Sequence, residues 1–176
     1  EAVNKAASIL SKAKFPVILS GAGVVIGNAI EECKILAERL DAPVCNGYQH
    51  NDSFPGSHPL AVGPLGYNGS KAAMQLISKA DVVLALGTRL NPFSTLPGYG
   101  IDYWPKNATI IQVDMNPDRI GLTKKVTVGI CGDCKMVAKQ ISDKLSKDAG
   151  NDGREERKNL IHKTKSAWLQ TLTGLD

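Results

Sequence analysis

The sequence has few of the residues that mark several classes of protein. Aromatic residues make up only 5% of its 176 residues, so a buried core must consist mainly of Val, Ile, Leu and Ala. Four cysteines in a chain of this length do not form the dense disulfide framework of small secreted domains. No apolar run approaches the roughly 20 residues that cross a bilayer, and residues 1–14 lack the pattern of a signal peptide. These absences favour a cytoplasmic protein without a membrane span.

The charge and the length of the chain exclude further classes of protein. The formal net charge is only +4, and much of the basic character lies in a polar C-terminal segment, which argues against nucleic-acid binding. A chain of 176 residues is long enough for one well-buried domain and short for two. It begins at Glu1 and ends in a charged helical segment. We therefore expect it to be a piece of a larger protein.

Short apolar runs and amphipathic segments recur along the chain. Fully apolar runs of about five residues are typical of strands that are buried on both faces of a parallel sheet. The runs are FPVILS, APVCN, DVVLALG, ATIIQVD and KKVTVGI. Helical spacing of apolar residues is found over residues 2–13, 28–40, 71–79, 135–145 and 155–172. Two long loops, residues 47–69 and 87–108, hold most of the prolines, and residues 146–154 have the composition of a linker.

A glycine-rich turn follows the first apolar run. Gly21, Ala22 and Gly23 open the segment GAGVVIG, which stands between a predicted strand and a predicted helix, as in dinucleotide-binding loops. The third glycine is Gly27, one residue further away than in GxGxxG, and the second run ends in Asn46 rather than an acidic residue. These departures argue against a standard NAD-binding domain. A tight turn that needs small residues is the alternative.

Charged residues follow other apolar runs. Asp114 ends one of these runs, and Arg89 and Asp133 follow shortly after two others. An arginine there can bind a phosphate, and the carboxylates can accept hydrogen bonds from a ribose or an adenine. Taken singly, the arginine could pair with a surface carboxylate, and each aspartate could cap a helix. Because ligands bind beyond the carboxyl ends of parallel strands, the combination predicts a binding site there.

A second glycine-rich stretch, GPLGYNGSKAAM, covers residues 63–74. Ser70 stands where the N-cap of the following helix is expected. A glycine-rich bend that leads into a helix can offer backbone N–H groups to an anion. This stretch, including Tyr67, Asn68 and Gly69, is therefore a candidate phosphate cradle.

No set of residues predicts catalysis or metal binding within this chain. Cys131 and Cys134 form a single CxxC, whereas a zinc site needs two further ligands at matched spacing. A thioredoxin-like pair is an alternative, but Gly132 and Asp133 between the cysteines favour a simple turn. The three histidines form no triad with a nucleophile. We assign no catalytic and no metal-binding residue.

Several motifs together resemble a known family. GPLGYNG, DVVLALGTRLNPF, ATIIQVDMNPDRIG and VGICGD occur in the order and spacing of the central domain of thiamine-diphosphate enzymes of the acetolactate synthase group. The resemblance covers residues 1–147. Within this group, residues 48–74 and 94–106 look most like the sulfoacetaldehyde acetyltransferases, which convert sulfoacetaldehyde and phosphate to acetyl phosphate and sulfite. An acetolactate synthase and a free-standing FAD- or ADP-binding module are the alternatives.

The resemblance implies a fold and a domain organisation. The fold is α/β, with a doubly wound, mostly parallel, Rossmann-like six-stranded sheet in a three-layer α/β/α arrangement. Residues 148–176 would form a linker and the start of a connector helix to a C-terminal domain. Thiamine diphosphate and Mg²⁺ would bind to the N- and C-terminal domains of the same chain, in a homo-oligomer. This chain alone would be an inactive scaffold.

The resemblance also implies which residues would contact a nucleotide. In relatives that hold FAD or ADP in this domain, the nucleotide lies along the strand ends. FAD-binding synthases have Arg-Phe-Asp-Asp-Arg where this chain has Arg89, Leu90, Asn91, Pro92 and Phe93, so two acids and the second arginine are missing. This difference argues against a bound flavin. The matching positions are Gly21, Ala22, Gly23, Tyr67, Asn68, Gly69, Arg89, Asp114 and Asp133.

Overall fold

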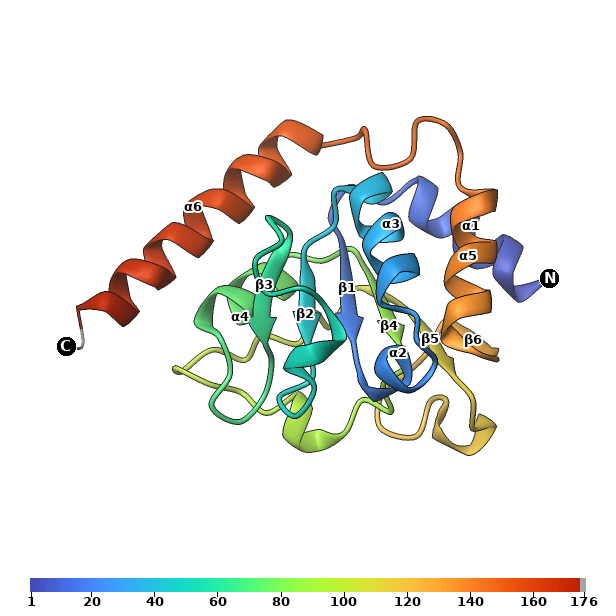
Figure 1. Cartoon of the computed structure of the whole chain (residues 1–176), viewed down its shortest axis with the longest axis horizontal. Coiled ribbons are helices and arrows are strands. Elements are labelled where there is room, and N and C mark those ends of the chain that lie inside the picture. Colours follow the sequence, from blue (N-terminus) through green and yellow to red (C-terminus); the bar gives the residue numbers. More distant parts are fainter. Residues whose placement is uncertain (175–176) are drawn as a thin grey trace.

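A six-stranded parallel sheet is the centre of the computed structural model, which describes residues 1–174 (Figure 1). The strand order is β3-β2-β1-β4-β5-β6, and each neighbouring pair is parallel. Every residue of the central strands β1 and β4 is buried, because helices or loops cover both faces of the sheet. The strands are β1 (Pro16–Ser20), β2 (Val44–Asn46), β3 (Ala61–Pro64), β4 (Val82–Leu86), β5 (Thr109–Asp114) and β6 (Val128–Cys131).

Helices lie on both faces of this sheet. The connections β1–α3–β2 and β3–α4–β4 run across the sheet in opposite directions, so right-handed crossovers place α3 and α4 on opposite faces. Helices α1 and α3 both pack against α5, whereas α4 packs against β2, β3 and α6. The predicted doubly wound three-layer fold is confirmed. The helices are α1 (Ala2–Ser11), α2 (Ala22–Ile26), α3 (Ile30–Leu40), α4 (Lys71–Ile77), α5 (Cys134–Lys144) and α6 (Arg154–Thr173).

Some local predictions from the sequence were incomplete. Strand β3 lies inside the predicted loop 47–69, where Gly63 and Pro64 interrupt any apolar run. It is an edge strand that pairs only with β2, with a register shift between Val44 and Cys45. The connections from β4 to β5 and from β5 to β6 contain only the short 3₁₀ turns η2 (Pro92–Ser94) and η3 (Pro117–Arg119). Strands and helices therefore do not alternate throughout the chain.

The predicted cap of α4 is confirmed. The Oγ atom of Ser70 accepts a hydrogen bond from the backbone N–H of Ala73 at 3.2 Å. At the start of α5, the Asp133 carboxylate accepts from the N–H of Met136 at 3.0 Å, so Asp133 is an N-cap, the alternative role considered for it.

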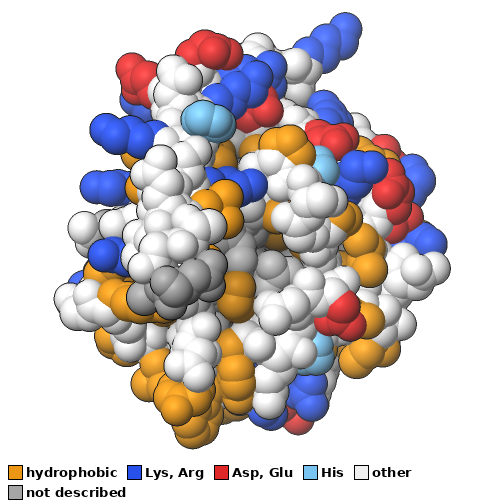
Figure 2. Space-filling view, turned by 60° about the vertical axis from the view of Figure 1, so that its left-hand side comes forward, with side chains coloured by type: hydrophobic (Ala, Val, Ile, Leu, Met, Phe, Trp, Pro, Cys, Tyr) orange, Lys and Arg blue, Asp and Glu red, His pale blue; other side chains and the backbone are white. Residues whose placement is uncertain are grey.

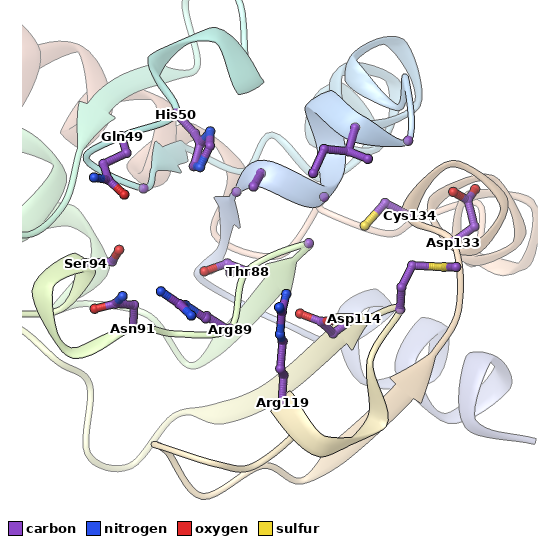
Figure 3. A pocket seen from close by; sticks show the side chains of 18 residues that line it. Gln49, His50, Thr88, Arg89, Asn91, Ser94, Asp114, Arg119, Asp133 and Cys134 are labelled. Carbon is purple, nitrogen blue, oxygen red and sulfur yellow. The ribbon is translucent and has the colours of Figure 1, made fainter.

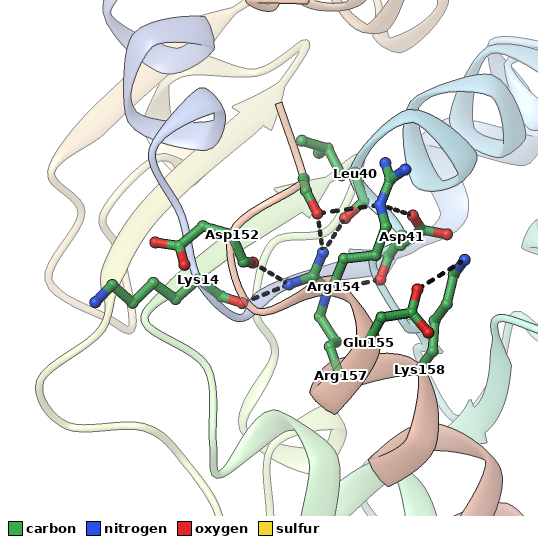
Figure 4. Close-up of polar contacts among 9 residues, drawn as sticks. Lys14, Leu40, Asp41, Asp152, Arg154, Glu155, Arg157 and Lys158 are labelled. Carbon is green, nitrogen blue, oxygen red and sulfur yellow. Dashed lines mark hydrogen bonds and ion pairs between the residues drawn. The ribbon is translucent and has the colours of Figure 1, made fainter. Parts of the chain in front are cut away.

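The C-terminal segment is attached to the body by a buried arginine (Figure 4). The predicted helix is present as α6, and Arg157 and Ile161 in its first half are buried against the rest of the chain. The Arg157 side chain is buried, and its guanidinium donates five hydrogen bonds to backbone carbonyls. These carbonyls belong to Lys14, Leu40, Asp41, Gly150 and Asp152. Arg157 thus joins α6 to the end of α3 and to the segment before β1.

None of the helices over residues 1–174 is both long enough and apolar enough to cross a bilayer.

Candidate functional site

A pocket of about 460 Å³ opens at the carboxyl ends of β1, β4 and β5 (Figure 3). This is where the strand order reverses, between β1 and β4, and where open α/β sheets bind their ligands. The volume lies in the range of small-molecule sites, about 300–1,000 Å³. The lining residues come from the turn after β1, the loops after β2, β4 and β5, and the start of α5. The fold thus brings together segments that are far apart in the sequence.

Glycines form the floor of the pocket. The N–H of Gly23 donates to the carbonyl of Gly87 at 2.8 Å, and the N–H of Gly21 donates to that of Leu86 at 3.0 Å. A Cβ atom at Gly23 would lie 2.7 Å from the Cα atom of Gly87, closer than real side chains approach. Gly87 also has a φ of +64°, in the left-handed region. Glycine is therefore required at this contact, which supports the explanation of GAGVVIG as a tight turn that needs small residues.

Two arginines point into the pocket from the side opposite His50 and Gln49 (Figure 3). Arg89 follows β4 and Arg119 ends η3, and neither forms an ion pair among residues 1–174. The buried Gln112 donates from Nε2 to the carbonyls of Arg119 and Thr88, at 3.1 Å each. The backbones that carry the two cations are therefore held to one side chain of β5. The two guanidinium groups give this side of the pocket a positive charge, which favours an anionic ligand.

The two predicted aspartates line the pocket, but each already has a structural role. Asp114 is buried, and its Oδ1 atom accepts a hydrogen bond from the N–H of Asn116 at 2.8 Å. One oxygen of Asp133 caps α5. Both carboxylates retain oxygen atoms that could accept hydrogen bonds from a ligand hydroxyl or amine.

Six of the nine predicted binding residues line this pocket. They are Gly21, Ala22, Gly23, Arg89, Asp114 and Asp133. Residues that the sequence reasoning did not single out also line it: Gln49, His50, Thr88, Ser94, Met115 and Arg119. A signal existed for Thr88 and Met115, which directly follow two predicted strands, and for Arg119, which lies five residues after a predicted strand. Gln49, His50 and Ser94 lie in long loops whose paths the sequence pattern does not determine.

Tyr67, Asn68 and Gly69 do not line the pocket. Two N–H donors of this bend are used within the protein: Tyr67 donates to the carbonyl of Phe93, and Gly69 donates to that of Gly66. The N–H of Gly66 itself donates to the Tyr103 hydroxyl at 3.2 Å. The bend is thus fastened to loop 87–108. Its proposed role as a phosphate cradle gains no support from this geometry.

The CxxC pair does not form a redox or metal centre in this arrangement. Cys131 is exposed, whereas Cys134 is buried, and burial together with nearby Asp133 and Asp114 raises the pKa of its thiol to about 12. A thiol with such a pKa stays protonated at neutral pH and is a poor nucleophile. Among residues 1–174, no group of three or more His, Cys, Asp or Glu side chains is placed to hold a metal ion.

Comparison with known families gives one strong match. Residues 3–141 match the model described as "Thiamine pyrophosphate enzyme, central domain". The chain is also similar to a solved structure of an enzyme from Mycobacterium smegmatis, described as thiamin diphosphate-dependent. The TM-score is 0.65 at 25% sequence identity, and the match covers 82% of this chain and 27% of the other.

Curated relatives are similar over nearly the whole chain. A protein of Rhizobium meliloti (strain 1021) named "Probable sulfoacetaldehyde acetyltransferase" is 77% identical over 99% of this chain and 30% of its own length. The "Sulfoacetaldehyde acetyltransferase" of Roseovarius nubinhibens is 73% identical over 100% of this chain and 29% of its own length. A "Probable acetolactate synthase large subunit" of Methanococcus aeolicus is 33% identical over 98% of this chain and 28% of its own length. The chain therefore spans about 30% of the length of these relatives.

Proposed function

Since this chain belongs to the thiamine pyrophosphate enzyme central domain family, we propose that it is the middle domain of a longer sulfoacetaldehyde acetyltransferase. The complete enzyme would convert sulfoacetaldehyde and phosphate to acetyl phosphate and sulfite. The observation that carries this proposal is the gap in identity between two groups of relatives. Proteins named for that activity are 77% and 73% identical to this chain, whereas an acetolactate synthase is 33% identical.

Within that enzyme, this domain would act as a scaffold. Thiamine diphosphate supplies carbanion stabilisation when it is bound, and its diphosphate is usually held through Mg²⁺ by oxygen ligands. The residues of this chain do not fit that group, because residues 1–174 contain no cluster of metal-ligating side chains. We place thiamine diphosphate and Mg²⁺ on the N- and C-terminal domains of the same cytoplasmic polypeptide. Residues 148–176 would lead to the C-terminal domain, and the complete chain would form a homo-oligomer.

The pocket would be an accessory nucleotide cradle. Arg89 and Arg119 line it, and their guanidinium groups could pair with phosphates. Asn91 and Pro92 stand where FAD-binding synthases have acids, so the flavin ring would lack those partners. We therefore propose a residual site for an ADP-like ligand with no part in the chemistry, rather than a flavin site.

We expect ADP to bind this chain weakly, with a Kd of about 0.1–1 mM, and FAD to bind no more tightly. Changing Arg89 to methionine should weaken ADP binding about tenfold or more, because one of the phosphate partners is lost. Isothermal titration calorimetry on the chain and on R89M measures both constants. The exposed Lys79→Met is a matched control, since Lys79 lies at the opposite end of the sheet, near the start of β4. Equal affinity in wild type and R89M would contradict the proposed cradle.

The proposed substrate is tested on the full-length polypeptide. With thiamine diphosphate and Mg²⁺ present, we expect sulfoacetaldehyde and phosphate to yield acetyl phosphate and sulfite in equal amounts. Pyruvate, the donor of acetolactate synthases, should be turned over at least about 100-fold less efficiently, a difference of roughly 2.7 kcal/mol in transition-state binding. Acetolactate formation from pyruvate at the higher rate would instead favour the acetolactate synthase alternative.

A further inference from the structure

An exposed apolar patch lies on the loops beside α4 and continues onto the last turns of α6. Exposed side chains make up most of it, with exposed fractions of 63% for Tyr67, 58% for Phe93 and 54% for Tyr99. We call it the loop–helix patch. It consists of Tyr67, Phe93, Leu96, Tyr99, Trp168 and Leu172. Single exposed apolar residues are ordinary on protein surfaces, whereas a contiguous group of large ones usually marks an interaction site.

The contacts within the patch make it continuous. The N–H of Tyr67 donates to the carbonyl of Phe93 at 3.1 Å, so these two residues are neighbours. The Tyr99 hydroxyl donates to the carbonyl of Gly69 at 3.0 Å, which places Tyr99 beside the same bend. The rings of Tyr99 and Trp168 meet edge to face at 5.5 Å, and Leu172 follows Trp168 by one helical turn. Figure 2 shows hydrophobic side chains gathered on this face below the C-terminal end of α6.

The course of α6 indicates what covers this patch. Arg157 fixes the start of the helix, Lys165 donates to the Pro59 carbonyl at 2.8 Å, and Trp168 contacts Tyr99. The helix is therefore held at three places and ends beside the patch. The chain matches a family of central domains and spans about 30% of its curated relatives, so more polypeptide is expected after α6. That polypeptide emerges next to the exposed aromatic rings.

We propose that the loop–helix patch is the surface against which the domain following residue 176 docks in the full-length polypeptide. This inference rests on one part of the proposed function, namely that the chain belongs to a longer polypeptide. It does not depend on the substrate of that polypeptide. Covering the patch removes the exposed parts of several aromatic rings from water, which favours docking. Helix α6 already packs on this chain, so the first part of the segment that joins the two domains is ordered before docking. This order reduces the entropy lost on docking.

Crosslinking of the full-length protein tests this docking. A photoreactive phenylalanine, p-benzoylphenylalanine, is introduced in place of Phe93, and crosslinked peptides are identified by mass spectrometry after irradiation. We expect peptides from beyond residue 176 of the same polypeptide to account for most of the crosslinks. The same replacement at Leu122, which is 69% exposed and lies outside the patch, is the control and should give at least about tenfold fewer such crosslinks.

The other outcomes of this experiment would overturn the proposal. A mixture of isotopically heavy and light protein separates crosslinks within one chain from those between two copies. Crosslinks between copies, crosslinks to residues before Glu1, or no enrichment over the Leu122 control would each exclude docking of the following domain. Acetyl phosphate formation by the same unmodified protein is measured separately. If the unmodified protein forms no acetyl phosphate, the proposed substrate is wrong, and the docking result is unchanged.

Discussion

Replacing Arg157 with methionine is expected to lower the free energy of unfolding by about 3–5 kcal/mol, because a buried, charged hydrogen-bonding hub is removed. Only 1% of the residue is exposed, and its guanidinium donates to five backbone carbonyls at 2.5–2.9 Å. Burial lowers the pKa of this guanidinium from its usual value. A methionine fills part of the space but leaves all five carbonyls without this donor.

Urea denaturation measures this loss. Lys158→Met is the matched control, because Lys158 lies on the same helix and, among the described residues 1–174, pairs only with exposed Glu155 at 3.9 Å. We expect the control to change stability by less than about 0.5 kcal/mol. Arg157→Lys should recover only part of the stability, because an ammonium has three donors and cannot span the five carbonyls. A loss for R157M no larger than the control would show that the hub contributes little.

Replacing Gly87 with alanine should be similarly damaging, with a loss of about 2–5 kcal/mol. The backbone at Gly87 has a φ of +64°, which strains any residue with a Cβ atom. The added atom would also lie 2.7 Å from the Cα atom of Gly23 and 2.8 Å from the nitrogen of Val24. Since these are backbone atoms, the turn after β1 must shift, and the floor of the pocket shifts with it.

The same substitution at a permissive glycine provides the control for Gly87. A Cβ atom at Gly56 would meet nothing within 4 Å, and its φ lies outside the left-handed region. Gly56→Ala should therefore change stability by less than about 1 kcal/mol, or stabilise the chain slightly. We expect the denaturation midpoint of G87A to be clearly lower than that of G56A when both are measured under the same conditions. Equal midpoints would contradict the close packing at the switch point of the sheet.

The sequence predicted the parts of the fold that depend on local pattern. Runs such as DVVLALG are apolar at every position, so strand β4 and its burial on both faces could be predicted. Strand β3 could not, because its hydrogen bonds to β2 determine it and its glycine and proline argue for a loop. Arg157 looked like one of many charges on a polar helix. Its partners are backbone carbonyls up to 143 residues away, which no sequence pattern indicates.

The candidate site could be predicted where residues adjoin strands. Asp114 is the last residue of β5 and Arg89 lies three residues after the end of β4, so the parallel sheet places them at one edge. His50 and Ser94 reach the pocket from loops whose paths depend on tertiary contacts such as the hydrogen bond between Tyr67 and Phe93. The stretch around Tyr67 had the composition of an anion cradle. The N–H groups of Gly66, Tyr67 and Gly69 are nevertheless paired within the fold, which composition alone does not reveal.

The most direct test of the account is an acetyl-transfer assay on residues 1–176 beside the full-length polypeptide. Both are given thiamine diphosphate, Mg²⁺, sulfoacetaldehyde and phosphate, and acetyl phosphate is quantified. We predict product from the full-length polypeptide and none above background from residues 1–176, because we propose that the groups that perform the chemistry belong to the other domains. Acetyl phosphate made by residues 1–176 alone would contradict the assignment of this chain as a scaffold.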